Sequence, residues 1–172
     1  MKHLIVRGRP GVGKSTLLGK LIEGCSLPIC GFMTKKTVDA DKTIEIYIHA
    51  ASTAPEDRTY GKENLLARWE KGTDRVVFTE TFDTMGVRLL EEQNETGFLV
   101  MDELGFLEKN AFVFQEAVLK ALDGKLPVLA AIKDKDNDFL LKVAAHPRCE
   151  VFDITKENRD ELFVTLSKKL AG

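Results

Sequence analysis

A short glycine-rich segment near the start of the chain constrains this protein more than any other feature of its sequence. Its eight residues, GRPGVGKS at positions 8–15, match the spacing G-x-x-x-x-G-K-[ST] at every fixed position. A short strand-like segment at residues 3–7 precedes the loop, and an apolar-periodic stretch at residues 16–22 follows it. This order predicts a strand, a tight loop and a helix. We therefore expect residues 8–15, the glycine-rich loop, to bind phosphate groups.

The residue types in this loop suit the tail of a nucleoside triphosphate. Glycines let successive backbone N–H groups turn toward phosphate oxygens, and the following helix adds the positive end of its dipole. We expect Lys14 to reach the β- and γ-phosphates and Ser15 to offer its hydroxyl to a magnesium ion. Arg9 has no fixed role in the pattern and is interpreted as a solvated loop side chain. The predicted nucleotide-binding residues are Gly8, Arg9, Pro10, Gly11, Val12, Gly13, Lys14, Ser15 and Thr16.

An acidic pair follows the most apolar run of the chain. Residues 98–101, FLVM, predict a central strand that is covered on both faces, and Asp102 and Glu103 come directly after it. Asp102 is expected to help bind magnesium, and Glu103 to polarise the attacking water as a general base. Acids also suit a turn ahead of a helix, which is the alternative for Asp102 and Glu103. Glu108, at a predicted helix start, is interpreted as a charge that complements the helix dipole. The predicted catalytic residues are Lys14 and Glu103, and the predicted metal ligands are Ser15 and Asp102.

The rest of the chain alternates between strand-like and helix-like segments. Residues 30–38 and 43–50 predict an antiparallel hairpin, and residues 52–61 a surface loop. Further strands are expected at residues 75–79, 127–132 and 150–154, and helices at residues 81–93, 111–122, 139–145 and 156–170. Such alternation predicts an α/β fold, a three-layer sandwich with a mostly parallel central sheet. We expect one domain that spans residues 1–172.

The charge balance narrows the classes of partner. The chain has 25 basic and 27 acidic residues, and its formal net charge is -2. No overall positive field is therefore available for a polyanion, which argues against a nucleic-acid partner. The apolar run at the N-terminus is too short for a signal peptide or a membrane span, so we expect a cytoplasmic protein without membrane contact. The sequence indicates no particular protein partner.

Several polar and aromatic residues stay undecided on the sequence. Hydrolysis calls for a cation near the transferring phosphoryl group, and four arginines are candidates. Trp69 and Tyr60 suit either base stacking or packing. The segment KDKD at residues 133–136 follows a strand where a guanine-reading Asn-Lys-x-Asp motif would lie, but Ile132 occupies the asparagine position. The candidate arginines are Arg58, Arg68, Arg75 and Arg88.

Near the C-terminus, polar residues precede the last predicted helix. Thr155 is expected to be its N-cap, and acids follow in its first turn. Asn158 and Arg159 are not explained by capping. A polar contact from them to the base or ribose of a nucleotide is the alternative.

Four segments together resemble a known family. They are residues 8–16, residues 31–34 (GFMT), residues 100–105 (VMDELG) and residues 155–162. In this order they resemble the small nucleoside triphosphatases first described from thermophiles, whose animal relatives are called cancer-related nucleoside triphosphatases. The resemblance implies a RecA-like P-loop domain that hydrolyses ATP, GTP and other nucleoside triphosphates to the diphosphate and phosphate. It also implies Mg²⁺ as cofactor, loose base selectivity, residues 8–16 as nucleotide loop, and Asp102 with Glu103 as magnesium and water-activating pair.

The chain departs from this family at two places, which keeps other functions open. Phe106 stands where family members often have a lysine, and residues 52–74 look unlike the usual compact connection. A small P-loop nucleotide or nucleoside kinase is one alternative, although the dense arginine cluster of a kinase lid is missing. A nucleotide-binding switch with negligible turnover is the other.

Overall fold

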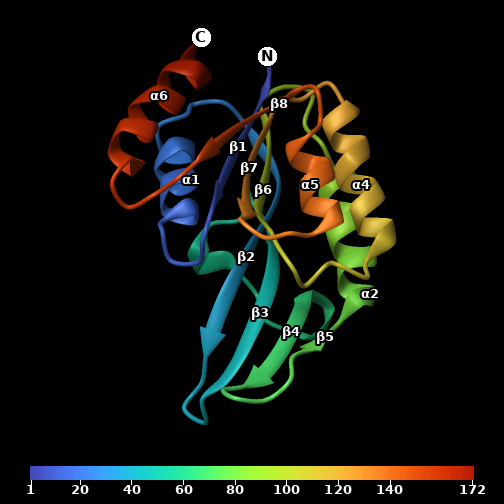
Figure 1. The fold of residues 1–172 in the computed structure, drawn as a ribbon. Coiled ribbons are helices and arrows are strands. Elements are labelled where there is room, and N and C mark those ends of the chain that lie inside the picture. Colours follow the sequence, from blue (N-terminus) through green and yellow to red (C-terminus); the bar gives the residue numbers. More distant parts are fainter.

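Eight strands form one mixed β-sheet in the computed structural model, which describes residues 1–172 (Figure 1). The strand order across the sheet is β5-β4-β3-β2-β6-β7-β1-β8. The strands are β1 (His3–Gly8), β2 (Ile29–Val38), β3 (Thr43–Ala50), β4 (Leu65–Glu70), β5 (Val76–Val77), β6 (Phe98–Leu104), β7 (Val128–Lys133) and β8 (Cys149–Asp153). Strands β2, β6, β7, β1 and β8 run parallel, whereas β3, β4 and β5 continue the sheet with antiparallel pairing.

The helices are α1 (Lys14–Glu23), α2 (Thr79–Thr81), α3 (Val87–Glu91), α4 (Phe112–Asp123), α5 (Asp138–Ala144) and α6 (Arg159–Ala171). Helices α1, α4 and α5 connect parallel strands, α2 and α3 lie between β5 and β6, and α6 follows β8. A π-helical segment, Phe82–Gly86, joins α2 to α3, and two short 3₁₀ turns lie at Pro55–Asp57 and Lys62–Asn64. Not one of these helices combines the length and the apolar character that crossing a bilayer requires.

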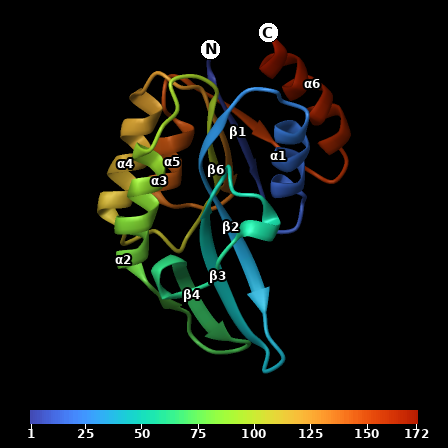
Figure 2. The same cartoon turned by 180° about the vertical axis from the view of Figure 1, so that it is seen from behind.

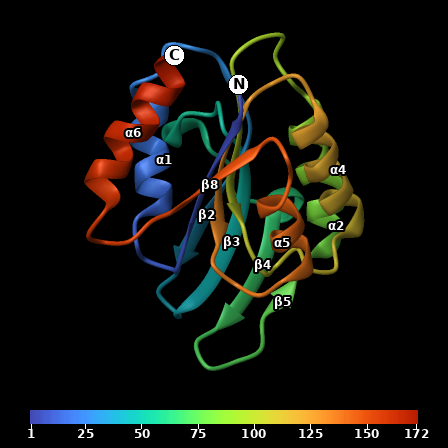
Figure 3. The ribbon, with the colours of Figure 1, turned by 45° about the horizontal axis from the view of Figure 1, so that its top comes forward.

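Helices cover both faces of the parallel strands (Figure 3). Helices α1 and α6 lie on one face, and α3, α4 and α5 on the other. On the first face, Leu18 and Leu166 are fully buried in one cluster with Val6 of β1. On the second face, Phe114 of α4 packs its ring against Phe32 and Phe82, with centroids 5.6 and 5.2 Å apart. The predicted three-layer α/β sandwich is thus confirmed.

The three central parallel strands bring their carboxyl ends to one edge of the sheet. Strand β7 lies between β1 and β6, and it pairs in parallel with both. The register places Gly8 opposite Lys133 and Asp102 opposite Ala131. Since ligands of open α/β sheets bind outside the carboxyl ends of the strands, this edge is the expected position of a functional site.

The predicted hairpin belongs to a larger structure, the antiparallel extension, which comprises β3, β4, β5 and the outer half of β2. The extension projects beyond the helical layers (Figure 2). No strand was predicted between the expected loop at residues 52–61 and residue 75, yet β4 lies there. Leu65, Leu66 and Ala67 are consecutive and all buried. The strand therefore lacks the alternation of apolar and polar residues by which a half-buried strand is recognised.

Other predicted boundaries shift for local reasons. The strand expected at residues 75–79 is only Val76–Val77, because the helix expected from residue 81 already begins at Thr79; this helix ends at Glu91. Strand β6 continues beyond residue 101 to Leu104. Asp102 remains paired with β2 on one side and β7 on the other, so backbone hydrogen bonding extends the strand where the side chains turn polar.

Gly31 is needed where β2 and β6 approach closely. Its φ is +94°, and a Cβ atom there would lie 2.1 Å from the Val100 carbonyl oxygen. Gly19 lies within α1, and a Cβ atom there would have no neighbour within 4 Å. We expect Gly31→Ala to lower the free energy of unfolding by about 2 kcal/mol or more, because a left-handed φ alone costs about 1–2 kcal/mol.

Urea unfolding of the two glycine variants checks this expectation. The matched variant Gly19→Ala should leave stability unchanged or raise it by about 0.5–1 kcal/mol, since alanine favours a helix interior. Equal stability of the Gly31 and Gly19 variants would contradict the interpretation of the close approach.

Candidate active site

The glycine-rich loop curves around the ammonium group of Lys14. This group donates hydrogen bonds to the carbonyl oxygens of Gly8 and Arg9, both at 2.9 Å. Gly13 is the N-cap of α1 and has a φ of +99°, a conformation that side-chain-bearing residues rarely adopt. The loop thus ends directly in the N-terminus of α1, where free backbone N–H groups attract anions. Arg9 is exposed, as expected.

Ser15 and Asp102 meet across the carboxyl edge of the sheet. The Ser15 hydroxyl donates to Asp102 Oδ1 at 2.8 Å, although the two residues come from α1 and β6. Asp102 is 6% exposed. Burial raises the pKa of this carboxyl to about 6, against the lowering effect of the Ser15 hydrogen bond. The sequence predicted these two side chains as joint ligands of one ion, and the structure brings them into contact.

The two oxygens suit a magnesium ion. Magnesium prefers oxygen ligands, and proteins commonly supply one or two of them while phosphate oxygens and water complete the octahedron. A hydroxyl and a buried carboxylate at the N-terminus of α1 have this chemistry. A divalent cation would also offset the cost of ionising Asp102 in its buried position.

Glu103 lies between two lysines. One carboxylate oxygen, Oε2, is 3.5 Å from Lys14 Nζ, and the other, Oε1, is 3.6 Å from Lys133 Nζ. The predicted catalytic pair, Lys14 and Glu103, is therefore brought together. Both partners of Glu103 are poorly exposed, with 4% of the Lys14 side chain and 23% of the Lys133 side chain accessible.

Lys133 was not predicted from the sequence to belong to this site. The sequence relates it only to a guanine-reading motif, yet it is the last residue of β7, beside the strand that contains Glu103. Its aliphatic chain passes over Gly105, where an added Cβ would lie 3.0 Å from Lys133 Cδ. Its place at the end of a predicted parallel strand was the available signal, whereas the pairing of that strand with β6 is visible only in the structure.

Phe106, at the position where family members often have a lysine, contributes no charge and lies near the protein surface. It is 40% exposed, and the ammonium group of Lys109 lies 4.4 Å from the ring centroid. The positive charge nearest to Glu103 other than Lys14 thus comes from Lys133 on β7 and not from the position where family members often have a lysine.

A cavity of about 580 Å³ opens over the glycine-rich loop. One side consists of loop and strand-end residues, and the opposite side consists of residues from the antiparallel extension. The first group is Pro10, Gly11, Gly13, Lys14, Ser15, Thr16, Glu103, Leu107 and Lys133; the second is Thr34, Lys36, Ile46, Trp69 and Arg75. The cavity therefore lies between the glycine-rich loop and the antiparallel extension, which contains the unpredicted strand β4.

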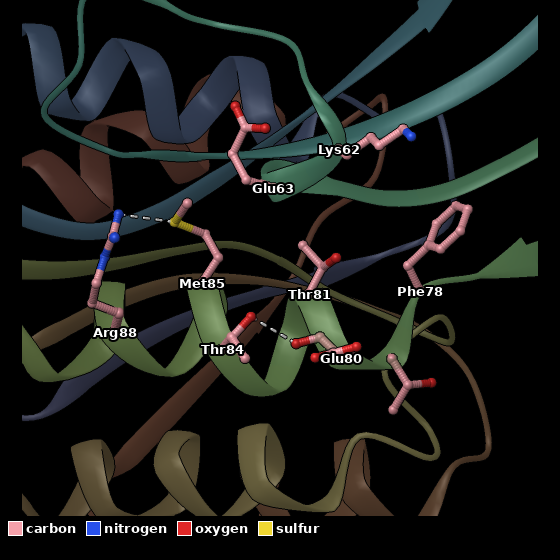
Figure 4. A pocket seen from close by; sticks show the side chains of 9 residues that line it. Lys62, Glu63, Phe78, Glu80, Thr81, Thr84, Met85 and Arg88 are labelled. Carbon is pink, nitrogen blue, oxygen red and sulfur yellow. Dashed lines mark hydrogen bonds between the residues drawn. The ribbon is translucent and has the colours of Figure 1, made fainter.

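Among the four candidate arginines, this cavity includes Arg75 alone. Arg68 pairs with Glu45 at 3.5 Å, and Arg58 donates to the sulfur of Met33. Arg88 lines a separate cavity of about 610 Å³ between the 62–64 turn and the α2–α3 helix, where it donates to Met85 Sδ (Figure 4). That cavity contains none of the loop residues.

A further cavity of about 340 Å³ lies beside the loop on the α6 side. Arg159 lines it together with Gly13 and Thr16. Asn158 does not, because its side chain accepts from the Thr155 N–H and donates to the Asp153 carbonyl. Helix α6 begins at Arg159 with Asn158 as its N-cap, three residues later than predicted. Thr155 instead caps the turn before the helix, where its hydroxyl accepts from the Asn158 N–H at 3.2 Å. The other lining residues are Leu17, Lys20, Asp160 and Phe163.

The two aromatic candidates have different environments. Tyr60 packs edge-on against Tyr47 and His49, with ring centroids 5.0 Å apart in each case, so it has a packing role. Trp69 lines the cavity over the loop, and the guanidinium carbon of Arg75 lies 4.8 Å from its ring centroid.

Comparison with known proteins identifies the family. A family model described as NTPase matches residues 3–166. The chain belongs to this NTPase family. Nucleoside-triphosphatase THEP1 of Thermotoga petrophila is 31% identical over 166 residues, which cover 92% of this chain and 87% of that protein. The cancer-related nucleoside-triphosphatase homolog of Bos taurus is 27% identical, with 94% and 92% covered. The resemblance that the motifs indicated is confirmed, and with it the enzyme class, a nucleoside-triphosphatase.

Two solved structures of NTPase family members share the fold. The crystal structure of THEP1 from Aquifex aeolicus aligns with a TM-score of 0.73 at 22% identity and covers 98% of each chain. The solution structure of a human cancer-related nucleoside triphosphatase aligns with a TM-score of 0.68 at 20% identity and covers 98% of this chain and 97% of that one. At these identities the likeness establishes the α/β architecture.

Glu108 gives the protein a stability that depends on pH. It is 3% exposed and accepts a hydrogen bond from the Gly105 N–H; it lies ahead of α4 rather than in its first turn. Burial raises its pKa from 4.5 to about 7. The folded state binds the Glu108 proton more tightly than the unfolded state. The contribution of Glu108 to the free energy of unfolding is therefore largest below pH 4.5 and falls as the pH rises to about 7.

We expect Glu108→Gln to remove this loss of stability at higher pH. The amide stays neutral and keeps an oxygen that accepts from the Gly105 N–H. At pH 8 the variant should exceed the parent protein in unfolding free energy by about 1–3 kcal/mol, since each pKa unit corresponds to about 1.4 kcal/mol. Urea unfolding at pH 5 and pH 8 measures the difference. Glu116→Gln, at an exposed position of α4, is the control and should change neither value. Parallel pH profiles for parent and Glu108→Gln would disprove the assignment.

Proposed function

We propose that this protein hydrolyses nucleoside 5′-triphosphates, ATP and GTP among them, to the diphosphate and phosphate with bound magnesium. All the groups concerned lie in one domain that spans residues 1–172. Loose base selectivity and a cytoplasmic location are part of the proposal. Membership of the NTPase family supports the reaction class.

The contact between Ser15 and Asp102 is the observation on which the proposal rests most directly. A loop that binds phosphate supplies one oxygen and a buried strand supplies the other, at 2.8 Å. These two oxygens would hold a magnesium ion beside the phosphate tail of a nucleotide. When bound, the ion would neutralise charge on the phosphates and so favour phosphoryl transfer. Ser15 and Asp102 would hold it.

The remaining side chains have roles that follow from their positions. Lys14, fixed inside the curve of the loop, would donate to oxygens of the β- and γ-phosphates. Glu103 would accept a proton from the water that attacks the γ-phosphorus. The two lysines that flank its carboxylate limit its rotation. Loop backbone N–H groups of residues 8–16 would surround the phosphate tail.

The cavity beside α6 is the proposed position of the ribose and base. It adjoins Thr16, at the start of α1, and it presents a mixture of charged and apolar side chains from Lys20, Arg159, Asp160 and Phe163. Long flexible charged side chains and one aromatic ring can contact any of the four bases. This composition supports loose base selectivity.

Phosphate release from ATP, GTP, CTP and UTP tests the proposal. We expect release from all four with magnesium and none after chelation. Lys14→Ala and Glu103→Gln should each lower the rate about a hundredfold or more, because each removes a group that acts in the transition state. Lys120→Ala and Glu116→Gln, at exposed positions of α4, are the matched controls and should keep the parent rate.

Release without an added acceptor distinguishes the hydrolase from a nucleotide kinase, which would need one. Tight nucleotide binding with no turnover, unchanged by Glu103→Gln, would favour a switch instead. Equal background rates in the parent, Lys14→Ala and Glu103→Gln would refute the proposed function.

Lys133 is expected to position Glu103 rather than to bind nucleotide. Lys133→Met keeps the aliphatic chain over Gly105 but removes the charge 3.6 Å from Glu103 Oε1. We expect kcat to fall by about tenfold with a smaller change in KM, since the carboxylate loses one of two anchors. Steady-state kinetics across pH 6–9 measures the changes in kcat and KM separately. Lys133→Arg should retain more activity than Lys133→Met; equal losses in the two variants would exclude a role for the charge.

A further inference from the structure

The cavity over the glycine-rich loop has a second side whose chemistry the proposed function does not use. Register pairs Lys36 with Ile46 and Ile44 with Trp69, and residues two apart on one strand share a face. Lys36, Ile46 and Trp69 therefore lie on one face of the antiparallel extension, the face that lines the cavity. Two cations, Lys36 and Arg75, are found on this side, and no carboxylate is among its lining residues.

Arg75 is held over the cavity by an aromatic ring. Its guanidinium carbon lies 4.8 Å from the centroid of Trp69, a distance at which a cation is attracted to the face of an indole. Arg75 forms no ion pair, in contrast to Arg68, which pairs with Glu45 on the opposite face of the same strands. The guanidinium thus retains its hydrogen-bond donors for another partner.

The turn that leads to Arg75 is ordered by local hydrogen bonds. Thr73 Oγ1 accepts from the Glu70 N–H at 3.0 Å and donates to the Glu70 carbonyl at 2.7 Å. Strand β5 then pairs Val76 with Arg68. The backbone on both sides of Arg75 is therefore ordered, so the side chain alone has to be oriented when it binds an anion.

We propose that Arg75, supported by Trp69, supplies the cation that contacts the transferring γ-phosphoryl group. This inference rests on the proposed function. In that reaction a water oxygen bonds to the γ-phosphorus and gives a proton to Glu103, while the bond to the β–γ bridging oxygen breaks and leaves the diphosphate with both electrons. Arg75 makes no covalent bond. It donates hydrogen bonds to γ-phosphoryl oxygens from the side opposite the loop.

Arginine suits this position because of its geometry. A planar guanidinium forms two parallel hydrogen bonds to phosphoryl oxygens, and it stacks on an indole at the same time. Lys14 approaches the phosphates from inside the loop, so Arg75 from the antiparallel extension would place positive charge on both sides of the group. The extension would thereby take part in the reaction.

Three variants test the inference kinetically. We expect Arg75→Ala to lower kcat about a hundredfold to a thousandfold, in the range known for loss of a group that stabilises phosphoryl-transfer charge. Arg75→Lys should recover part of this loss, and Trp69→Leu should cause a smaller loss of about tenfold because the cation is no longer supported. Arg68→Ala is the control, since Arg68 lies on the same strand pair but faces away from the cavity; its kcat should stay within about twofold of the parent value.

Binding measurements separate a catalytic role from a structural one. With magnesium, Arg75→Ala should bind ADP within about threefold of the parent, yet lose at least about a hundredfold in affinity for ADP with aluminium fluoride, a mimic of the transferring phosphoryl group. Trp69 is the sole tryptophan of the chain, so its fluorescence reports on the cation above it. The fluorescence of the parent should change with ADP and aluminium fluoride more than with ADP, and Arg75→Ala should remove this difference.

The outcomes distinguish the two proposals. If the parent releases phosphate and Arg75→Ala has the same kcat, or if Arg75→Ala and Arg68→Ala lose activity equally, the inference about Arg75 is wrong and the hydrolase proposal stands. Loss of ADP affinity parallel to the loss of kcat would likewise overturn it, in favour of a ground-state binding role. A parent protein that releases no phosphate above the Lys14→Ala background would overturn both.

Discussion

The site depends on the position of β7 between β1 and β6. Parallel pairing on both sides of β7 fixes the relative height of the two outer strands, so the loop after β1 and the acids at the end of β6 emerge at the same level. The hydrogen bond from Ser15 to Asp102 is the direct result. Apolar clusters beneath both helical layers stabilise this alignment, and a slip of one residue in either pairing would separate the serine from the carboxylate.

The elements closest to this contact were predictable from the sequence, and the reason is that their signals are local. Fixed spacing revealed the loop with Lys14 and Ser15, and an apolar run that ends in acids revealed Asp102 and Glu103. Strand β4 was missed because its buried residues are consecutive and do not alternate. Lys133 and Arg75 were not assigned because their place in the site follows from strand order and cross-strand register. Those relations join segments that are distant along the chain.

The positive charge beside Glu103 comes from two elements that are distant along the chain. In the segment after the central strand, Phe106 lies near the surface with Lys109 above its ring. Lys133 brings an ammonium group to Glu103 from the neighbouring strand. Gly105 is small enough to let that side chain pass. The positive charge at the carboxyl edge of the sheet therefore comes from residues that no single motif contains.

Strand β2 belongs to both halves of the molecule. Its first residues pair with β6, and its later residues pair with β3, so one continuous backbone links the loop side of the cavity to the extension. Arg75 lies just before β5 of this extension, so the proposed cation comes from the same polypeptide as the glycine-rich loop. Under our proposal, every charged group that acts on the γ-phosphoryl group therefore belongs to a single folded chain.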